Sequence, residues 1–210
     1  MLNEVFNLKK TVKVSIALVL CAVMVFSFTA CGEVKNAEKT VTNYFTALCS
    51  KNFEESESYI IADEKTTEPQ TGDKDKKDDP ANDVFSQHFY DTFKYEILES
   101  EKVDKNTVNV KIKLNTADMT KILPEYLNLA LQLGFASAFD EEYTDEKMNA
   151  ELEKFMENSL KSENASMRET ELSVKVKKID GKWLIEADEK FADAVTGGMV
   201  TVANSLNVDE

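Results

Sequence analysis

Cysteine and histidine, which often serve as nucleophile and general base, are scarce in this chain: there are three cysteines and one histidine among 210 residues. Cys49 could act as a nucleophile or a redox thiol, and His88 could act as a general base or a metal ligand. No Cys, Asp or Glu stands at zinc-motif spacing from His88. We therefore expect Cys49 to be a small buried residue on a helix. We expect His88 to be partly buried and hydrogen-bonded beside Phe85 and Phe89.

Motifs of known catalytic chemistries are missing from the sequence. It has no Ser-His-Asp order, no nucleophile elbow, no phosphate-binding loop and no metal cluster. The aspartate-rich run 73–79 does not fit a calcium loop, because Lys77 occupies the fifth position and Asp78 the sixth, which must be Gly. We predict no catalytic residue, no metal site and no cofactor, and we interpret the run as solvated charge.

The first 32 residues have the features of a secretory signal. Three lysines precede an uncharged run from Val14 to Ala30, and small residues lead to Cys31. A basic head, an apolar body and a small-residue exit are typical of a signal peptide. The alternative is an uncleaved transmembrane anchor, although this run is at the lower limit of the length that spans a bilayer.

The end of this segment, Phe28-Thr29-Ala30-Cys31-Gly32, resembles the lipobox of bacterial lipoproteins. Phe28 and Thr29 depart from the Leu and the Ala or Ser that are usual there. The resemblance implies cleavage between Ala30 and Cys31, so that residues 1–30 are removed. It also implies a diacylglyceryl group on Cys31 that holds the protein on the extracytoplasmic face of the cell membrane. Two acyl chains are enough for stable attachment.

The charge of the chain restricts its partners. The formal net charge is −14, and loss of residues 1–30 removes three lysines and Glu4, leaving −16. Such a surface argues against binding to nucleic acid or to anionic lipid, since phosphate contacts need Lys and Arg. The remaining 180 residues are enough for one domain. Cys49 is then the one cysteine besides Cys31, so no intrachain disulfide is expected.

Period-two alternation predicts two antiparallel hairpins, each with one buried and one wet face. The first hairpin joins strands near 93–97 and 108–114, and the second joins strands near 172–176 and 182–185. Asp180-Gly181 is a typical tight turn between the second pair.

Helical spacing predicts the elements around these hairpins. We expect a tether at 31–36, a helix with an apolar face over 37–48, a second short helix over 53–61 and a closing helix that weakens at Gly197-Gly198. Residues 62–83 contain no Val, Ile, Leu, Met or aromatic residue, which predicts a mobile charged loop. The whole of 37–206 would form a single domain.

A helical insertion is predicted between the hairpins, over residues 118–161. Pro124 should kink it or open the helix one turn in. Residues 127–139 are apolar nearly all round, which is typical of a helix buried on several sides or facing a partner. Thr144 is expected to cap a second helix. That helix has an apolar stripe of Met148, Leu152, Phe155, Met156 and Leu160.

The predicted architecture is α+β, an antiparallel sheet of about four strands with helices packed on one face and a helical insertion. At Asp180-Gly181-Lys182-Trp183-Leu184-Ile185 the chain resembles the last hairpin of extracytoplasmic domains with the cystatin-like, nuclear-transport-factor-2-like fold, found in many Gram-positive lipoproteins. That resemblance implies a curved sheet wrapped around a long helix, with a conical pocket between them.

These patterns favour a membrane-anchored module that binds a small apolar ligand or a protein partner, and not an enzyme. The first alternative is an enzyme with His88, Cys49 or a buried carboxylate in the cone. The second is a structural envelope protein without a small ligand, which a filled cone would favour.

Overall fold

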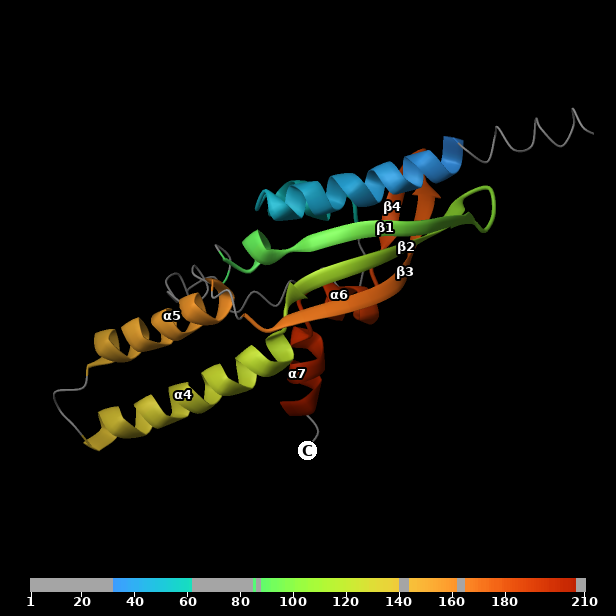
Figure 1. Ribbon diagram of the computed structural model, residues 1–210. Helices are drawn as coiled ribbons and strands as arrows, with labels where there is room; N and C mark the ends of the chain where they lie inside the picture. The colour runs from blue at the N-terminus through green and yellow to red at the C-terminus, as the bar shows by residue number, and fades with distance from the viewer. Residues whose placement is uncertain (1–31, 62–84, 86–87, 140–143, 162–164, 207–210) are drawn as a thin grey trace, which may run out of the picture.

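The computed structural model describes residues 32–61, 85, 88–139, 144–161 and 165–206 (Figure 1). An N-terminal helix occupies residues 32–49 and is followed by two short helices, α2 (Phe53–Glu57) and η1 (Tyr90–Thr92). The other elements, in chain order, are β1 (Lys94–Lys102), β2 (Thr107–Ala117), α4 (Met119–Phe139), α5 (Asp145–Lys161), β3 (Met167–Ile179), β4 (Lys182–Glu186), α6 (Glu189–Val195) and α7 (Met199–Leu206). Within these ranges, no helix combines the length and the apolar character needed to cross a membrane.

The four strands form one antiparallel sheet in the order β1-β2-β3-β4. Tyr95 of β1 is paired with Leu114 of β2, which is paired with Thr170 of β3. The register of β1 shifts between Ile97 and Glu99, a bulge that bends the edge of the sheet. The predicted fold class, α+β with a four-stranded antiparallel sheet, is confirmed.

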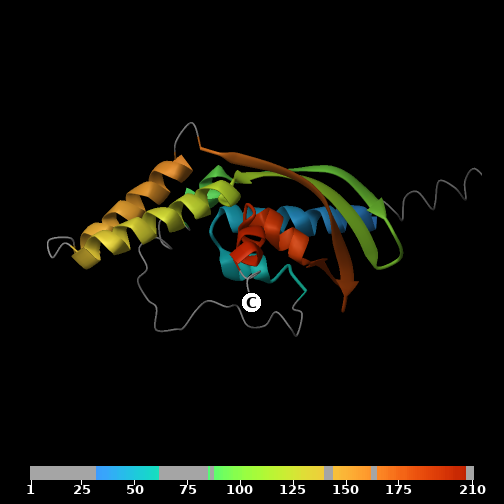
Figure 2. The same ribbon diagram turned by 90° about the horizontal axis from the view of Figure 1, so that it is seen from below.

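One face of the sheet packs in the hydrophobic core and the other faces solvent, as the alternation of apolar and polar residues predicted. Val108, Val110, Ile112 and Leu114 of β2 are fully buried, and the N-terminal helix and α6 lie on this concave inner side (Figure 2). Aromatic rings fill the space between the layers. Phe45 of the N-terminal helix stacks on Tyr95, with ring centroids 4.7 Å apart.

The N-terminal helix forms because its apolar residues recur every three or four positions and face the sheet. Ala37, Val41 and Phe45 are fully buried. The predicted tether at 31–36 was wrong for residues 32–36, which are already helical. The physical reason is that this turn has contacts of its own: Glu33 pairs with Lys102 of β1, and Val34 packs against the core.

The predicted short helix over 53–61 ends earlier than expected, at Glu57. Ile60 instead forms a parallel bridge with Ile185 of β4, in which the Ile61 amide donates to the Ile185 carbonyl at 2.9 Å. The edge strand β4 has backbone groups that must be paired, and this pairing outweighs continuation of the helix.

On the outer face, lysines and glutamates pair across the strands. Lys111 pairs with Glu171 at 3.0 Å and Lys113 with Glu169 at 2.8 Å. The hydrogen bond from Lys111 holds the pKa of Glu171 below its usual value. These side chains are about half exposed, so the pairs fix cross-strand register and add little to stability.

Candidate functional site

The helical insertion is an antiparallel pair, α4 and α5, that extends beyond the end of the sheet (Figures 1 and 2). It joins β2 to β3, and α5 packs along α4. The predicted stripe of α5 faces this contact, since Leu152, Met156 and Leu160 are buried. From α4, Ile122 and Leu133 are buried. One side of α4 is therefore covered by α5.

Pro124 lies inside α4, five residues after its start at Met119, so the expectation that it opens the helix was wrong. Asp118 explains why the helix begins earlier. Its carboxylate accepts a hydrogen bond from the Thr120 hydroxyl at 2.5 Å and pairs with Lys121 at 3.1 Å. An anion is favourable at a helix N-terminus. These contacts stabilise the first turn ahead of the proline.

The opposite side of α4 carries a row of exposed apolar side chains, which we call the α4 stripe: Leu127, Leu131, Phe135 and Phe139. Their exposed fractions are 36%, 64%, 68% and 89%, so exposure rises toward the tip of the insertion. Residues four apart on a helix lie above one another, and the stripe is about 18 Å long at 1.5 Å per residue. Apolar surface that forms a continuous row on a folded protein commonly marks an interaction site.

The surroundings of the α4 stripe are uncharged on α4 and acidic on α5. No charged residue occurs from Tyr126 to Phe139. The α5 segment carries five acidic residues and three lysines. A partner that binds the α4 stripe would therefore contact apolar groups without having to bury a charged side chain of α4.

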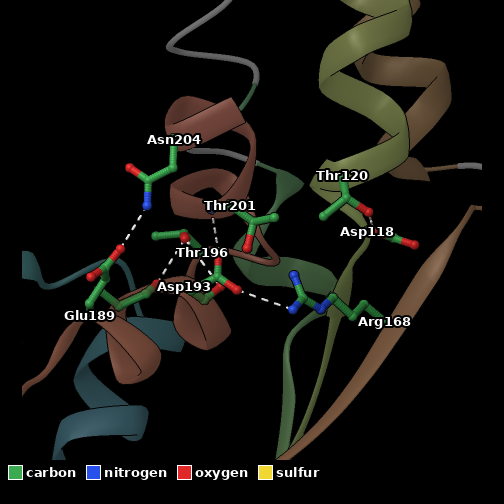
Figure 3. Close-up of polar contacts among 9 residues, drawn as sticks. Asp118, Thr120, Arg168, Glu189, Asp193, Thr196, Thr201 and Asn204 are labelled. Carbon is green, nitrogen blue, oxygen red and sulfur yellow. Dashed lines mark hydrogen bonds and ion pairs between the residues drawn. The ribbon is translucent and has the colours of Figure 1, made fainter. Parts of the chain in front are cut away.

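Polar contacts near the base of the insertion join the two C-terminal helices to each other and to β3 (Figure 3). Arg168, at the start of β3, donates to the Asp193 carboxylate of α6 at 3.1 Å. The other oxygen of Asp193 accepts from the Thr201 amide of α7 at 2.7 Å, and Asn204 donates to Glu189 at 2.7 Å. Asp193 thus joins the charge of Arg168 to the first turn of α7. These contacts fix α6, α7 and β3 relative to one another.

Gly197 and Gly198 separate α6 from α7 in conformations that favour glycine, with φ of 66° and 96°. The Gly197 carbonyl accepts from the Met119 amide of α4 at 2.9 Å. A Cβ on Gly198 would lie 2.0 Å from Nη1 of Arg168 and 2.4 Å from Cγ2 of Thr120. The glycine pair, which the sequence predicted as a weak point of one helix, is a close contact between three elements.

A surface depression of about 470 Å³ lies beside these contacts, between β3 and the two C-terminal helices. Arg168, Asp193 and Asn204 line it. Arg168 donates to Asp193 through Nη2, and Asn204 donates to Glu189. Nη1 of Arg168 is buried without a hydrogen-bond partner among the described residues and lies against Gly198.

His88 lines a different depression, of about 520 Å³, on the outer side of the sheet near the end of α5. Its Nδ1 lies 3.6 Å from the Asp91 carboxylate, and Asp91 also pairs with Lys51 at 2.9 Å. The Lys51 hydrogen bond, with a smaller contribution from His88, lowers the pKa of Asp91. The side chain of His88 is partly buried, as expected, and an acidic neighbour is present, as a general base would require.

Cys49 lies on the N-terminal helix, half-buried and free, and packs against the core. Burial raises the pKa of its thiol. A reactive cysteine needs the opposite shift, so this environment favours an inert thiol. Among the described residues, no group of three or more His, Cys, Asp and Glu side chains could hold a metal ion.

Three sequence predictions lie outside the described residues: the signal segment 1–30, the lipidation residue Cys31 and the charged loop 62–83. The α4 stripe was indicated by the sequence only as a helix apolar nearly all round. The Arg168–Asp193 contact was missed, since no local pattern signals an ion pair between residues 25 apart. Comparison with protein-family models, with curated proteins and with solved structures finds no match.

Proposed function

We propose that this protein is a bacterial lipoprotein whose extracytoplasmic domain binds another protein through the α4 stripe. The observation that carries the proposal is the row of four large apolar side chains, up to 89% exposed, on a helical pair that extends from the sheet. Exposing such groups is costly in water, so a permanent or transient partner is the physical explanation for their arrangement.

A protein partner fits the stripe better than a small ligand does. Small molecules bind in concave sites that bury most of their surface, whereas the stripe is a convex ridge along one helix. The inner face of the sheet, where the cystatin-like resemblance would place a pocket, is lined by fully buried side chains such as Phe45 and Ile112. That filled core supports a protein that holds no small ligand there.

The lipid anchor is supported by the sequence and agrees with the shape of the molecule. Cys31 is covalently next to Gly32, which begins the described helix, so a lipid on Cys31 would hold that end of the molecule close to the membrane. The tip of the α4–α5 pair lies at the opposite end of the molecule (Figure 1). The anchor and the stripe are therefore separate, and each can be tested without disturbing the other.

The binding proposal is tested with full-length protein extracted from membranes in mild detergent. Phe135→Glu places a charge in the middle of the stripe, and Ala150→Glu places the same charge on the exposed side of α5 as a matched control. We expect the wild type and Ala150→Glu to sediment as a larger assembly, and Phe135→Glu to sediment as a single chain. Identical sedimentation of all three proteins would contradict the proposal.

The anchor is tested by Cys31→Ser, which removes the thiol that would carry the lipid. We expect the wild type to be cleaved before residue 31 and to fractionate with membranes, and the variant to remain unprocessed and unlipidated by mass spectrometry. A wild-type N-terminus without an added lipid mass would contradict the anchor and leave the α4 proposal intact.

A second candidate, an enzyme, is supported by one observation, the His88–Asp91 pair in the depression on the outer side of the sheet. Here His88 would act as a general base toward a substrate in that depression. Chromogenic ester and phosphoester substrates test this idea against a His88→Gln control. Hydrolysis that depends on His88 would support it, and equal rates in both proteins would exclude this role for His88.

A further inference from the structure

We infer that the partner on the α4 stripe is a second copy of this chain, paired antiparallel about a two-fold axis. The inference rests on the proposed function, because it identifies the protein that binds there. A symmetric dimer needs a surface that is complementary to itself, in which residue i meets residue j and j meets i. The spacing along α4 has this property.

The four stripe residues are two leucines followed by two phenylalanines, each four residues apart. With a two-fold axis at the level of Leu133, Leu131 of one copy faces Phe135 of the other, and Leu127 faces Phe139. Every leucine of one copy then lies opposite a phenylalanine ring of the other, and no two rings face each other.

Small residues beside the stripe allow close approach of a second helix. Gly134 and Ala138 fall next to Leu127 and Leu131 at helical spacing, and both are exposed. A Cβ built on Gly134 would meet no atom within 4 Å. The helix axis is therefore accessible here, and the two helical pairs together would form a four-helix bundle.

The available apolar area fits a modest dimer. A covered aromatic ring buries 150–250 Å², so Phe135 and Phe139, which are 68% and 89% exposed, offer roughly 300 Å². The leucines and small residues extend this toward the area of about 800 Å² per partner that is typical of stable complexes. Attachment of both copies to one membrane would raise their effective concentration and favour a contact of this size.

Charge favours the antiparallel arrangement and disfavours a lipid surface as occupant. After loss of residues 1–30 each copy would have a net charge of −16, and antiparallel helices place the two acidic bodies at opposite ends of the bundle. A parallel pair would place them side by side. Anionic leaflets attract basic segments, whereas α5 is acidic on balance, with five acidic residues against three lysines.

Disulfide trapping tests the partner and the register together. Two differently tagged full-length chains, both with Cys49→Ala, are produced in one bacterial strain, one with Leu127→Cys and the other with Phe139→Cys. Membranes are then oxidised, and the products are separated without reductant. A disulfide needs Cβ atoms about 4 Å apart. We expect a product that joins the two tags, at least tenfold more abundant than either same-tag product, because positions 127 in the two copies would be about 18 Å apart along the axis.

The control replaces Leu127→Cys by Ala150→Cys, on the exposed side of α5, and should give no mixed-tag product. Both stripe positions are exposed, and an unchanged thermal midpoint of each variant shows that folding is intact. Same-tag products alone would overturn the antiparallel register. Absence of any product would overturn the second copy as occupant. In that case, loss of the larger assembly in Phe135→Glu would still support a different protein partner, so the two proposals fail separately.

Discussion

Individual residues near the base of the insertion determine how the C-terminal helices meet β3 and α4. Arg168, Asp193 and Gly198 connect β3, α6 and α7 through one ion pair and one close approach. The sequence identified Gly197-Gly198 as an interruption of a helix, because glycine lowers helix propensity. It could not identify Arg168 as the reason that Gly198 must lack a Cβ, since that contact depends on the tertiary fold.

Two glycine substitutions test this contact, because we expect them to change the free energy of unfolding in opposite directions. Gly198→Ala should lower the free energy of unfolding by about 2 kcal/mol or more, because it combines a strained positive φ with a clash against Arg168. Gly134→Ala should raise it by about 0.5–1 kcal/mol, since Gly134 is helical and a Cβ there meets nothing. Urea denaturation measures both. Equal effects of the two changes would contradict the structure at Gly198.

Asp118 gives a prediction about pH. Burial alone would raise the pKa of this carboxyl, but hydrogen bonds from Thr120 and Lys121 outweigh burial and hold the pKa below its usual value. A lowered pKa contributes stability that is present above the unfolded value, about 3.9, and is lost as the pH falls through the folded value.

Asp118→Asn should therefore destabilise the protein by about 1–2 kcal/mol at pH 7, where the charged hydrogen bonds are lost. The difference between variant and wild type should shrink as the pH falls below about 4. Denaturation at a series of pH values measures this difference. If the difference in unfolding free energy between variant and wild type stays constant down to pH 3, the carboxylate charge of Asp118 contributes nothing to stability.

At the scale of elements, strands were easier to predict than the environment of helices. Alternation in residues 108–114 and 172–176 determines which face of each strand is buried, and the structure agrees. For α4 the sequence showed only apolar residues nearly all round. Which side α5 covers depends on the connection and on packing with α7, so the exposed stripe could not be assigned in advance.

Neighbouring residues on α4 should therefore respond very differently to truncation. Leu133→Ala removes a buried side chain from the contact with α5 and should cost about 2–4 kcal/mol. Phe135→Ala removes a ring that is 68% exposed and should change stability by less than about 0.5 kcal/mol at dilute, monomeric concentration. Thermal and urea denaturation distinguish the two. A large loss for Phe135→Ala under those conditions would mean that the ring is part of the folded core.

At the scale of the whole molecule, the order of hairpins and helices led to the correct fold class. The first helical turn at 32–36 and the bridge from Ile60 to Ile185 were not predictable, because both depend on contacts between distant parts of the chain. The result is an acidic body with Cys31, the proposed site of the lipid anchor, next to one end and an apolar helix face near the other. This arrangement suits a protein that is held at a membrane and meets a protein partner through the α4–α5 pair.

The most direct test of this account is photo-crosslinking in intact bacteria. A photoreactive amino acid is placed at position 135 of the full-length chain, and separately at position 150 as the control. We predict a polypeptide adduct from position 135 and none from position 150. No adduct at position 135, an adduct with lipid alone, or equal adducts at both positions would contradict a protein-binding role for the α4 stripe.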